Sequence, residues 1–237
     1  NSLKHMGGHA MRIAFDKLKR RHLAVLLVLA AVLLSVIPLA RGVFAEPMRV
    51  GVSRSAHSSL IYVAEAQGFF KKQGLDVIIK EYELSLESVN DLVADKVDIA
   101  TAGEFAFVMR SFQRPDLRIP AVISKASDMD LIVRKDRGIA GPQDLKGKRV
   151  AVVRGGQAEF FLYNYLIFNR IPTDSVHVVY RAPSEMLKSM ADGTVDAALC
   201  WPPYTTQMMK QLGATGARWP GQSGQEYYQA LFSKEGF

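Results

Sequence analysis

The sequence predicts a two-lobed α/β protein that binds a ligand in a cleft between its lobes. From Met48 onward, short β-branched runs alternate with longer segments of helical spacing, as in parallel strands joined by crossover helices. Residues 50–59 and residues 150–159 share one pattern: a strand, an arginine, small residues and then the start of a helix. Residues 92–101 and residues 190–199 share a second pattern: the end of a helix, a turn and then a strand. We therefore expect one βαβαβ unit used twice, with a ligand held where the carboxyl ends of both sets of strands face each other.

The individual elements follow from local pattern. Residues 59–72 have the spacing of a helix with Leu60, Val63, Ala64 and Phe70 near one face, and Gly74 is its stop. Pro142 starts a short helical turn. Strands are expected at residues 48–53, 76–82, 98–102, 119–125, 130–134, 149–154, 176–180 and 196–200. The expected division is an N-terminal extension with leader (1–45), a first lobe (46–124), a second lobe (125–224) and the start of a return to the first lobe (225–237).

The composition is that of a globular protein, because 49% of the residues are hydrophobic and 22% are charged. This excludes a disordered, collagen-like or multi-span membrane protein. Residues 1–45 hold seven Lys and Arg against Asp16 alone, so the rest of the chain carries only +1 of the net charge of +7. Binding a nucleic-acid backbone requires a concentrated basic face, and we expect no nucleic-acid partner.

An export signal is expected at the N-terminus. The basic segment is followed by an uncharged apolar run over residues 23–40 and by the small-residue pattern Val43-Phe44-Ala45, which is typical of a cleaved secretory signal. A retained signal anchor is the alternative, since the 18 uncharged residues reach the lower limit of a membrane span. In both cases the body of the chain is periplasmic.

Sequence signatures of common enzymes are absent: the chain has no G-x-S-x-G, H-E-x-x-H, Walker or G-x-G-x-x-G motif. After the leader only His57 and His177 remain, and their spacing is not that of metal ligands. Cys200 is the single cysteine, so no intramolecular disulfide forms, and we expect a small buried thiol. We therefore expect no catalytic residue, no metal and no cofactor.

Candidate binding residues lie where strands end and helices begin, because free backbone N–H groups at helix starts favour anions or polar head groups. For the serines among the candidates listed below, the alternative to ligand binding is N-capping of a helix. For the arginine, the alternative is a solvated position at the rim. In the second half, Trp201 precedes two prolines and cannot continue a strand, so its ring either covers an apolar part of the ligand or plugs the core. The candidates are Ser55, His57, Ser58, Gly103, Glu104, Phe105, Arg154, Gly155, Gly156, Gln157, Trp201 and Tyr204.

Four segments carry a family resemblance: LIYVAEAQGFFKKQGLDV (60–77), ADKVDIATAG (94–103), GPQDLKGKRVAV (141–152) and VDAALCWPPY (195–204). Together they resemble the nitrate, sulfonate and taurine type periplasmic solute-binding proteins of ABC importers, a superfamily that includes thiamine-precursor-binding proteins. The resemblance implies a type II two-lobed fold, a monomer that closes on a sulfonate, nitrate, taurine or pyrimidine-like solute, and an inner-membrane permease as partner. It also implies a pocket built from the candidates named above other than Arg154.

Two alternatives remain beside the transport hypothesis. The first is the periplasmic sensor domain of a membrane-tethered signalling protein, and the second is an enzyme that resembles a thiamine-pyrimidine synthase. Members of the resembled family also continue past the final strand with helices that return to the first lobe, whereas this sequence ends at Phe237. We therefore expect the C-terminal part of the fold to be missing and apolar surface of the first lobe to be exposed.

Overall fold

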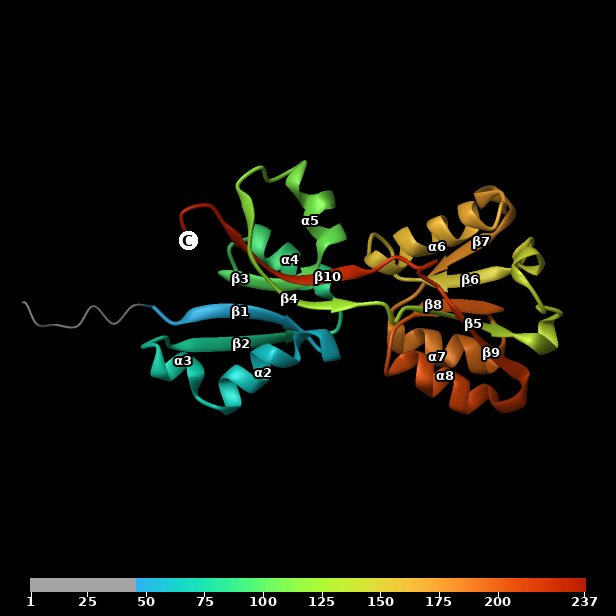
Figure 1. The fold of residues 1–237 in the computed structure, drawn as a ribbon, viewed down its shortest axis with the longest axis horizontal. Coiled ribbons are helices and arrows are strands. Elements are labelled where there is room, and N and C mark those ends of the chain that lie inside the picture. Colours follow the sequence, from blue (N-terminus) through green and yellow to red (C-terminus); the bar gives the residue numbers. More distant parts are fainter. Residues whose placement is uncertain (1–45) are drawn as a thin grey trace, which may run out of the picture. The chain divides into compact units, whose positions relative to one another are not determined.

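Two five-stranded mixed sheets carry the fold of residues 46–237, the part of the chain that this computed structural model describes (Figure 1). The first sheet has the order β2-β1-β3-β10-β4 and the second the order β7-β6-β8-β5-β9. The strands of the first sheet are β1 (Met48–Ser53), β2 (Val77–Tyr82), β3 (Ile99–Gly103), β4 (Leu117–Ala126) and β10 (Tyr227–Lys234). Those of the second are β5 (Asp130–Arg134), β6 (Arg149–Val152), β7 (His177–Tyr180), β8 (Ala197–Cys200) and β9 (Gly216–Pro220).

Helices cover both faces of each sheet (Figure 1). In the first lobe, side chains of α4 and α5 form one apolar core with the sheet, and Ile61 of α2 contributes to a second core on the other face. In the second lobe, α6 packs on one face while α7 and α8 pack on the other. The helices are α2 (Ser59–Ala66), α3 (Phe69–Lys72), α4 (Ser85–Val93), α5 (Glu104–Ser111), α6 (Gln157–Phe168), α7 (Pro183–Asp192) and α8 (Tyr204–Leu212).

The predicted internal repeat is present in the topology. β1 is parallel to β2 and β3, and β6 is parallel to β7 and β8. In each sheet the three parallel strands are followed by an antiparallel strand: β10 lies beside β3, and β5 lies beside β8. The two sheets therefore have the same strand order and direction.

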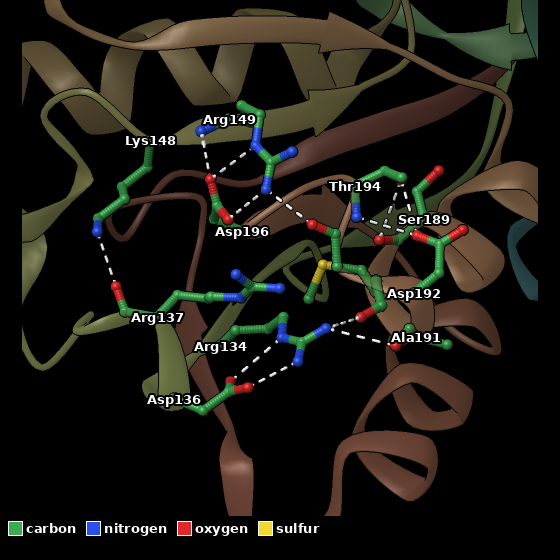
Figure 2. A network of polar contacts seen from close by, with 12 residues as sticks. Arg134, Asp136, Arg137, Lys148, Arg149, Ser189, Ala191, Asp192, Thr194 and Asp196 are labelled. Atoms are coloured by element: carbon green, nitrogen blue, oxygen red, sulfur yellow. Dashed lines mark hydrogen bonds and ion pairs between the residues drawn. The ribbon is translucent and has the colours of Figure 1, made fainter.

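The repeat extends to one ion pair in each lobe. Arg149 Nη2 lies 2.8 Å from Asp196 Oδ1, and the Arg149 backbone N–H also donates to this carboxylate at 2.9 Å. Arg49 and Asp98 make the same two contacts, at 2.7 and 2.8 Å. Figure 2 shows the pair of the second lobe, where Arg149 Nη2 donates at 2.7 Å to the carbonyl of Gly193, the residue after α7. Each pair ties the amino ends of two neighbouring parallel strands together.

We expect Asp196→Asn to lower the free energy of unfolding by about 2 kcal/mol at pH 7, because its side chain is only 9% exposed and its charged hydrogen bonds are lost. Asp98→Asn should cost about 1 kcal/mol, since Asp98 is 25% exposed. The Arg149 guanidinium holds the pKa of Asp196 below its usual range. The stabilisation that the Arg149–Asp196 ion pair provides is therefore complete above the unfolded-state pKa of Asp196, about 4. It is lost as the pH falls through the lower folded-state pKa. Urea unfolding at pH 7 and pH 3 measures it, and an equal cost at both pH values would contradict the assignment.

The predicted strands agree with the observed ones to within two residues at each end, but two strands were not predicted. β9 forms an edge of the second sheet, and β10 lies inside the first sheet between β3 and β4. The helix predicted over residues 59–72 is divided at Gly68, which has a φ of +64°. Its predicted apolar face was wrong at Leu60 and Val63, which are 57% and 48% exposed, whereas Phe70 packs into the core as predicted. Ile61 is the buried residue of α2, because it packs against the aliphatic side chains of β1.

Two connections pass between the sheets, at residues 127–129 and 221–226, and the buried side chain of Gln222 joins them. Its Oε1 accepts the Met129 N–H at 2.8 Å, while its Nε2 donates to the Gln225 carbonyl at 3.0 Å. The Gly221 N–H also donates to the Met129 carbonyl at 2.9 Å. The two crossings are therefore held as one unit.

The predicted leader lies outside the described residues. Within residues 46–237, we find no helix with the length and apolar character needed to span a bilayer. Cys200 is buried in the second lobe as predicted, and burial raises the pKa of its thiol to about 12.

Candidate functional site

A cavity lies between the two sheets and receives residues from both lobes. Its empty space is about 640 Å³ when the solvent-open mouth is included. The first sheet and its loops contribute Ser53, Ser55, His57, Glu83, Leu84, Ser85, Leu86, Gly103, Ala106, Tyr227 and Gln229. The second lobe contributes Val153, Gly156, Gln157, Ala158 and Trp201, and Met129 comes from a crossing connection.

Three helices begin at this cavity. Leu84, Gly103 and Gly156, the residues that precede α4, α5 and α6, all line it. Helix N-termini expose unpaired N–H groups and carry the positive end of the helix dipole. Of the described residues that line the cavity, none is Lys or Arg. The attraction for an anion therefore comes from backbone dipoles, which suits a small anionic head group.

The lobes contact each other beside the cavity. Gln157, the first residue of α6, accepts the Phe105 N–H through its side-chain Oε1 at 3.2 Å. The Phe105 and Phe160 rings lie 5.1 Å apart, centre to centre. The Ser184 N–H at the start of α7 donates to Glu83 Oε1 at 3.2 Å. Each lobe thus places a side-chain oxygen on a helix N-terminus of the other lobe.

A buried polar network underlies the cavity on the first lobe. Ser58 Oγ lies 3.1 Å from Ser53 Oγ and 3.3 Å from Thr101 Oγ1. The Ser53 N–H donates to Thr101 Oγ1 at 3.1 Å, and Gln229 Nε2 donates to Ser53 Oγ at 3.3 Å. All four side chains are buried. The network joins β1, β3 and β10 at the edge of the sheet that faces the cavity.

Among the described residues that line the cavity, the ionisable side chains are those of His57, Glu83 and Tyr227. His57 Nε2 lies 3.2 Å from Asp128 Oδ2. Burial raises the pKa of Tyr227, and the Asp128 and Glu104 carboxylates raise it further. Burial also raises the pKa of Glu104, which accepts the Tyr228 N–H at 2.7 Å. No group of three or more His, Cys, Asp or Glu side chains within residues 46–237 is arranged to hold a metal ion.

Six of the twelve predicted site residues line the cavity, namely Ser55, His57, Gly103, Gly156, Gln157 and Trp201. Ser58 is buried beneath it in the polar network, and its side chain does not cap a helix. Glu104 bonds to β10, while Phe105 contributes its N–H to the Gln157 contact and its ring to Phe160.

The other three predicted residues have structural contacts. The Arg154 guanidinium lies 4.0 Å from the centre of the Tyr180 ring and is exposed. Gly155 has a φ of +67°, which shapes the turn before α6. Tyr204 packs edge-on against Trp201, with ring centres 6.4 Å apart. These residues support the cavity wall without lining it.

Several cavity residues were not predicted. Ser85 follows β2 at a helix start, so the rule that selected the other candidates also applied to it. Tyr227 and Gln229 belong to β10, and no local signal marks them, because they reach the cavity only through the pairing of β10 with β3.

Trp201 packs against both cores of the second lobe and lines the cavity, so its position agrees with the core role and leaves contact with a ligand as a prediction. We expect Trp201→Ala to weaken solute binding about tenfold or more and to lower the free energy of unfolding by roughly 2–3 kcal/mol, less than for a fully buried aromatic residue. Trp219→Ala is the matched control, because Trp219 packs against one of these cores and is not a cavity residue. Trp219→Ala should lower the free energy of unfolding and leave the affinity for the solute unchanged. Calorimetric titration and thermal melting measure both effects, and unchanged affinity in Trp201→Ala would remove the ring from the site.

Comparison with known proteins identifies relatives for most of the chain. The profile of the family described as NMT1/THI5 like matches residues 55–230. A Bacillus subtilis (strain 168) protein named "Putative aliphatic sulfonates-binding protein" is 26% identical over 174 residues, which cover 71% of this chain and 52% of that protein. The chain thus spans about half the length of this curated relative.

Two solved structures share the fold. The alkanesulfonate-binding protein SsuA from Xanthomonas axonopodis pv. citri, bound to MOPS, superposes with a TM-score of 0.68 at 18% identity, over 79% of this chain and 65% of that chain. The periplasmic aliphatic sulphonate binding protein SsuA from Escherichia coli gives a TM-score of 0.68 at 17% identity, over 80% and 61%. The predicted two-lobed fold and the predicted family resemblance are confirmed.

Proposed function

Because the chain belongs to the NMT1/THI5-like family, we propose that it is an exported, non-enzymatic protein that captures a small sulfonate-type solute for an ABC permease. The observation that carries this proposal is the cavity at which α4, α5 and α6 all begin, lined from both lobes and without Lys or Arg among the described residues. Capture and release there need no bond chemistry.

A sulfonate suits this site for physical reasons. Its three oxygens accept several N–H groups at once, and the helix dipoles stabilise its single negative charge without a cationic side chain. Trp201 and Tyr227 offer apolar surface to the organic part of the solute. The sulfonate-binding relative and the MOPS complex support this choice over nitrate and pyrimidines.

The mechanism that we propose is closure of the lobes on the solute. The two crossing connections, joined through Gln222, would act as one hinge. The anionic head group would bind at the start of α6, where Gly156 lines the cavity. A permease that contacts both lobes would then distinguish loaded from empty protein.

Thermal shift with propane-1-sulfonate, 2-hydroxyethanesulfonate, nitrate and a hydroxymethylpyrimidine tests the solute class. A ligand at 100 times its dissociation constant stabilises the fold by roughly 2.7 kcal/mol. We expect at least one sulfonate to raise the melting temperature at a lower concentration than nitrate or the pyrimidine does. Stabilisation by the pyrimidine alone would overturn the sulfonate assignment.

Mass spectrometry of the mature N-terminus separates transport from sensing. A freely diffusing carrier is expected to begin near Glu46, directly after Val43-Phe44-Ala45. A protein that retains residues 23–40 in the membrane would instead support the tethered sensor.

A further inference from the structure

The floor of the cavity carries two polar groups that the anionic head does not explain. We propose that Ser53 and Gln229 determine specificity by hydrogen-bonding a neutral polar group at the far end of the solute, so that hydroxyalkylsulfonates are preferred over alkylsulfonates. This inference rests on the proposed function, because it assumes that the anionic end binds at the start of α6 on the opposite lobe.

The side chain of Gln229 is positioned to contact a ligand. The residue is only 3% exposed, it lines the cavity, and it pairs with Gly103 of the neighbouring strand. Its Nε2 donates to Ser53 Oγ at 3.3 Å and to Ser58 Oγ at 3.5 Å. Its Oε1 accepts no hydrogen bond from any residue that the structure describes, so this oxygen is left as an acceptor for a ligand in the cavity.

Ser53 supplies a hydroxyl group at the cavity. Its N–H donates to Thr101 Oγ1 at 3.1 Å, and its Oγ accepts from Gln229 Nε2 at 3.3 Å. Ser58 Oγ lies 3.1 Å from Ser53 Oγ and 3.3 Å from Thr101 Oγ1, and in each pair either hydroxyl can donate. When Thr101 donates to Ser58 and Ser58 donates to Ser53, the Ser53 hydroxyl proton is available to a ligand, and Ser53 lines the cavity.

The floor therefore offers one donor and one acceptor side by side. A hydroxyl group on the solute satisfies both, because it accepts from Ser53 and donates to Gln229. A methyl group in the same place leaves the Gln229 carbonyl without a donor, and an unpaired polar group is the condition under which hydrogen-bonding sites reject analogues most strongly. An apolar floor would give the opposite preference, since it would favour the methyl group.

Calorimetric titration with two near-isosteric pairs tests the proposal. The first pair is 2-hydroxyethanesulfonate and propane-1-sulfonate, and the second, one methylene longer, is 3-hydroxypropane-1-sulfonate and butane-1-sulfonate. We expect the hydroxyl member of at least one pair to bind about tenfold tighter or more. Gln229→Met, which keeps the volume and removes the acceptor, should abolish that preference.

Two further variants keep the result interpretable. Ser53→Ala removes a single oxygen and should reduce the same preference, so the proposal remains testable if Gln229→Met fails to fold. Gln222→Met is the matched control, because Gln222 is the buried glutamine of the crossing connections and is not a cavity residue. It should retain the preference even if its stability falls.

The outcomes separate this inference from the proposed function. Sulfonate binding without a hydroxyl preference in either pair overturns the role of Ser53 and Gln229 and leaves the proposed function standing. A preference that Gln222→Met also removes overturns the specific role of Gln229. Failure of all four sulfonates to bind overturns the sulfonate assignment itself.

Discussion

Replacement of Gly156 by valine is expected to abolish solute binding, with a loss of affinity above about a hundredfold, while the free energy of unfolding changes little. Gly156 has φ −103° and ψ 174°, an extended conformation that any residue adopts. An added Cβ would meet Val153 Cγ1 at 3.5 Å and the Val153 carbonyl at 3.7 Å, both ordinary contacts. A branched side chain at the start of α6 would nevertheless fill the place of a solute head group that bonds to the backbone.

Gly155→Ala supplies the opposite control. Gly155 is not a cavity residue, but its φ of +67° makes any side chain there strained by about 1–2 kcal/mol. It should therefore lose stability and retain affinity. Calorimetric titration and chemical unfolding of both variants measure the contrast. Normal affinity in Gly156→Val would show that the solute does not approach this helix start.

Phe232→Ala is expected to have the largest effect on stability, a loss of about 3–5 kcal/mol. Phe232 is fully buried on β10 and packs edge-on against Phe107 of α5, with ring centres 5.7 Å apart. Proteins of this kind are stable by roughly 5–15 kcal/mol. The substitution would therefore remove a large part of the total and loosen the strand that also carries Tyr227 and Gln229 into the cavity.

Tyr228→Ala is the control on the same strand. Its side chain is 43% exposed, and the contact it makes with Glu104 uses the backbone N–H, which the substitution keeps. We expect a loss below about 1 kcal/mol. Urea unfolding followed by circular dichroism measures both variants. A cost for Phe232→Ala as small as that for Tyr228→Ala would mean that β10 contributes little to the first lobe.

Local sequence was sufficient for the strands, the repeat and half of the candidate site. Short β-branched runs marked β1 to β8 because burial in a sheet imposes that composition on each segment by itself. The repeated Val-Asp segments marked Asp98 and Asp196, which occupy equivalent positions in the two lobes. Helix starts after strands marked Gly103, Gly156 and Gln157, because every parallel strand places its carboxyl end on the same side of its sheet.

The remaining features depend on segments that are far apart in the chain. β10 contacts β3 across more than a hundred residues, and nothing in its own sequence specifies that position in the sheet. Gln229 and the Ser53 hydroxyl gain their significance only from that pairing, because the buried network contains residues of three different strands. That Ile61 and not Leu60 is the buried side chain also follows from where α2 packs on β1. The sequence by itself determined the elements and their order, while the tertiary structure decided which polar groups face the cavity together, because hydrogen-bond satisfaction is a property of the assembled neighbourhood and not of any one segment.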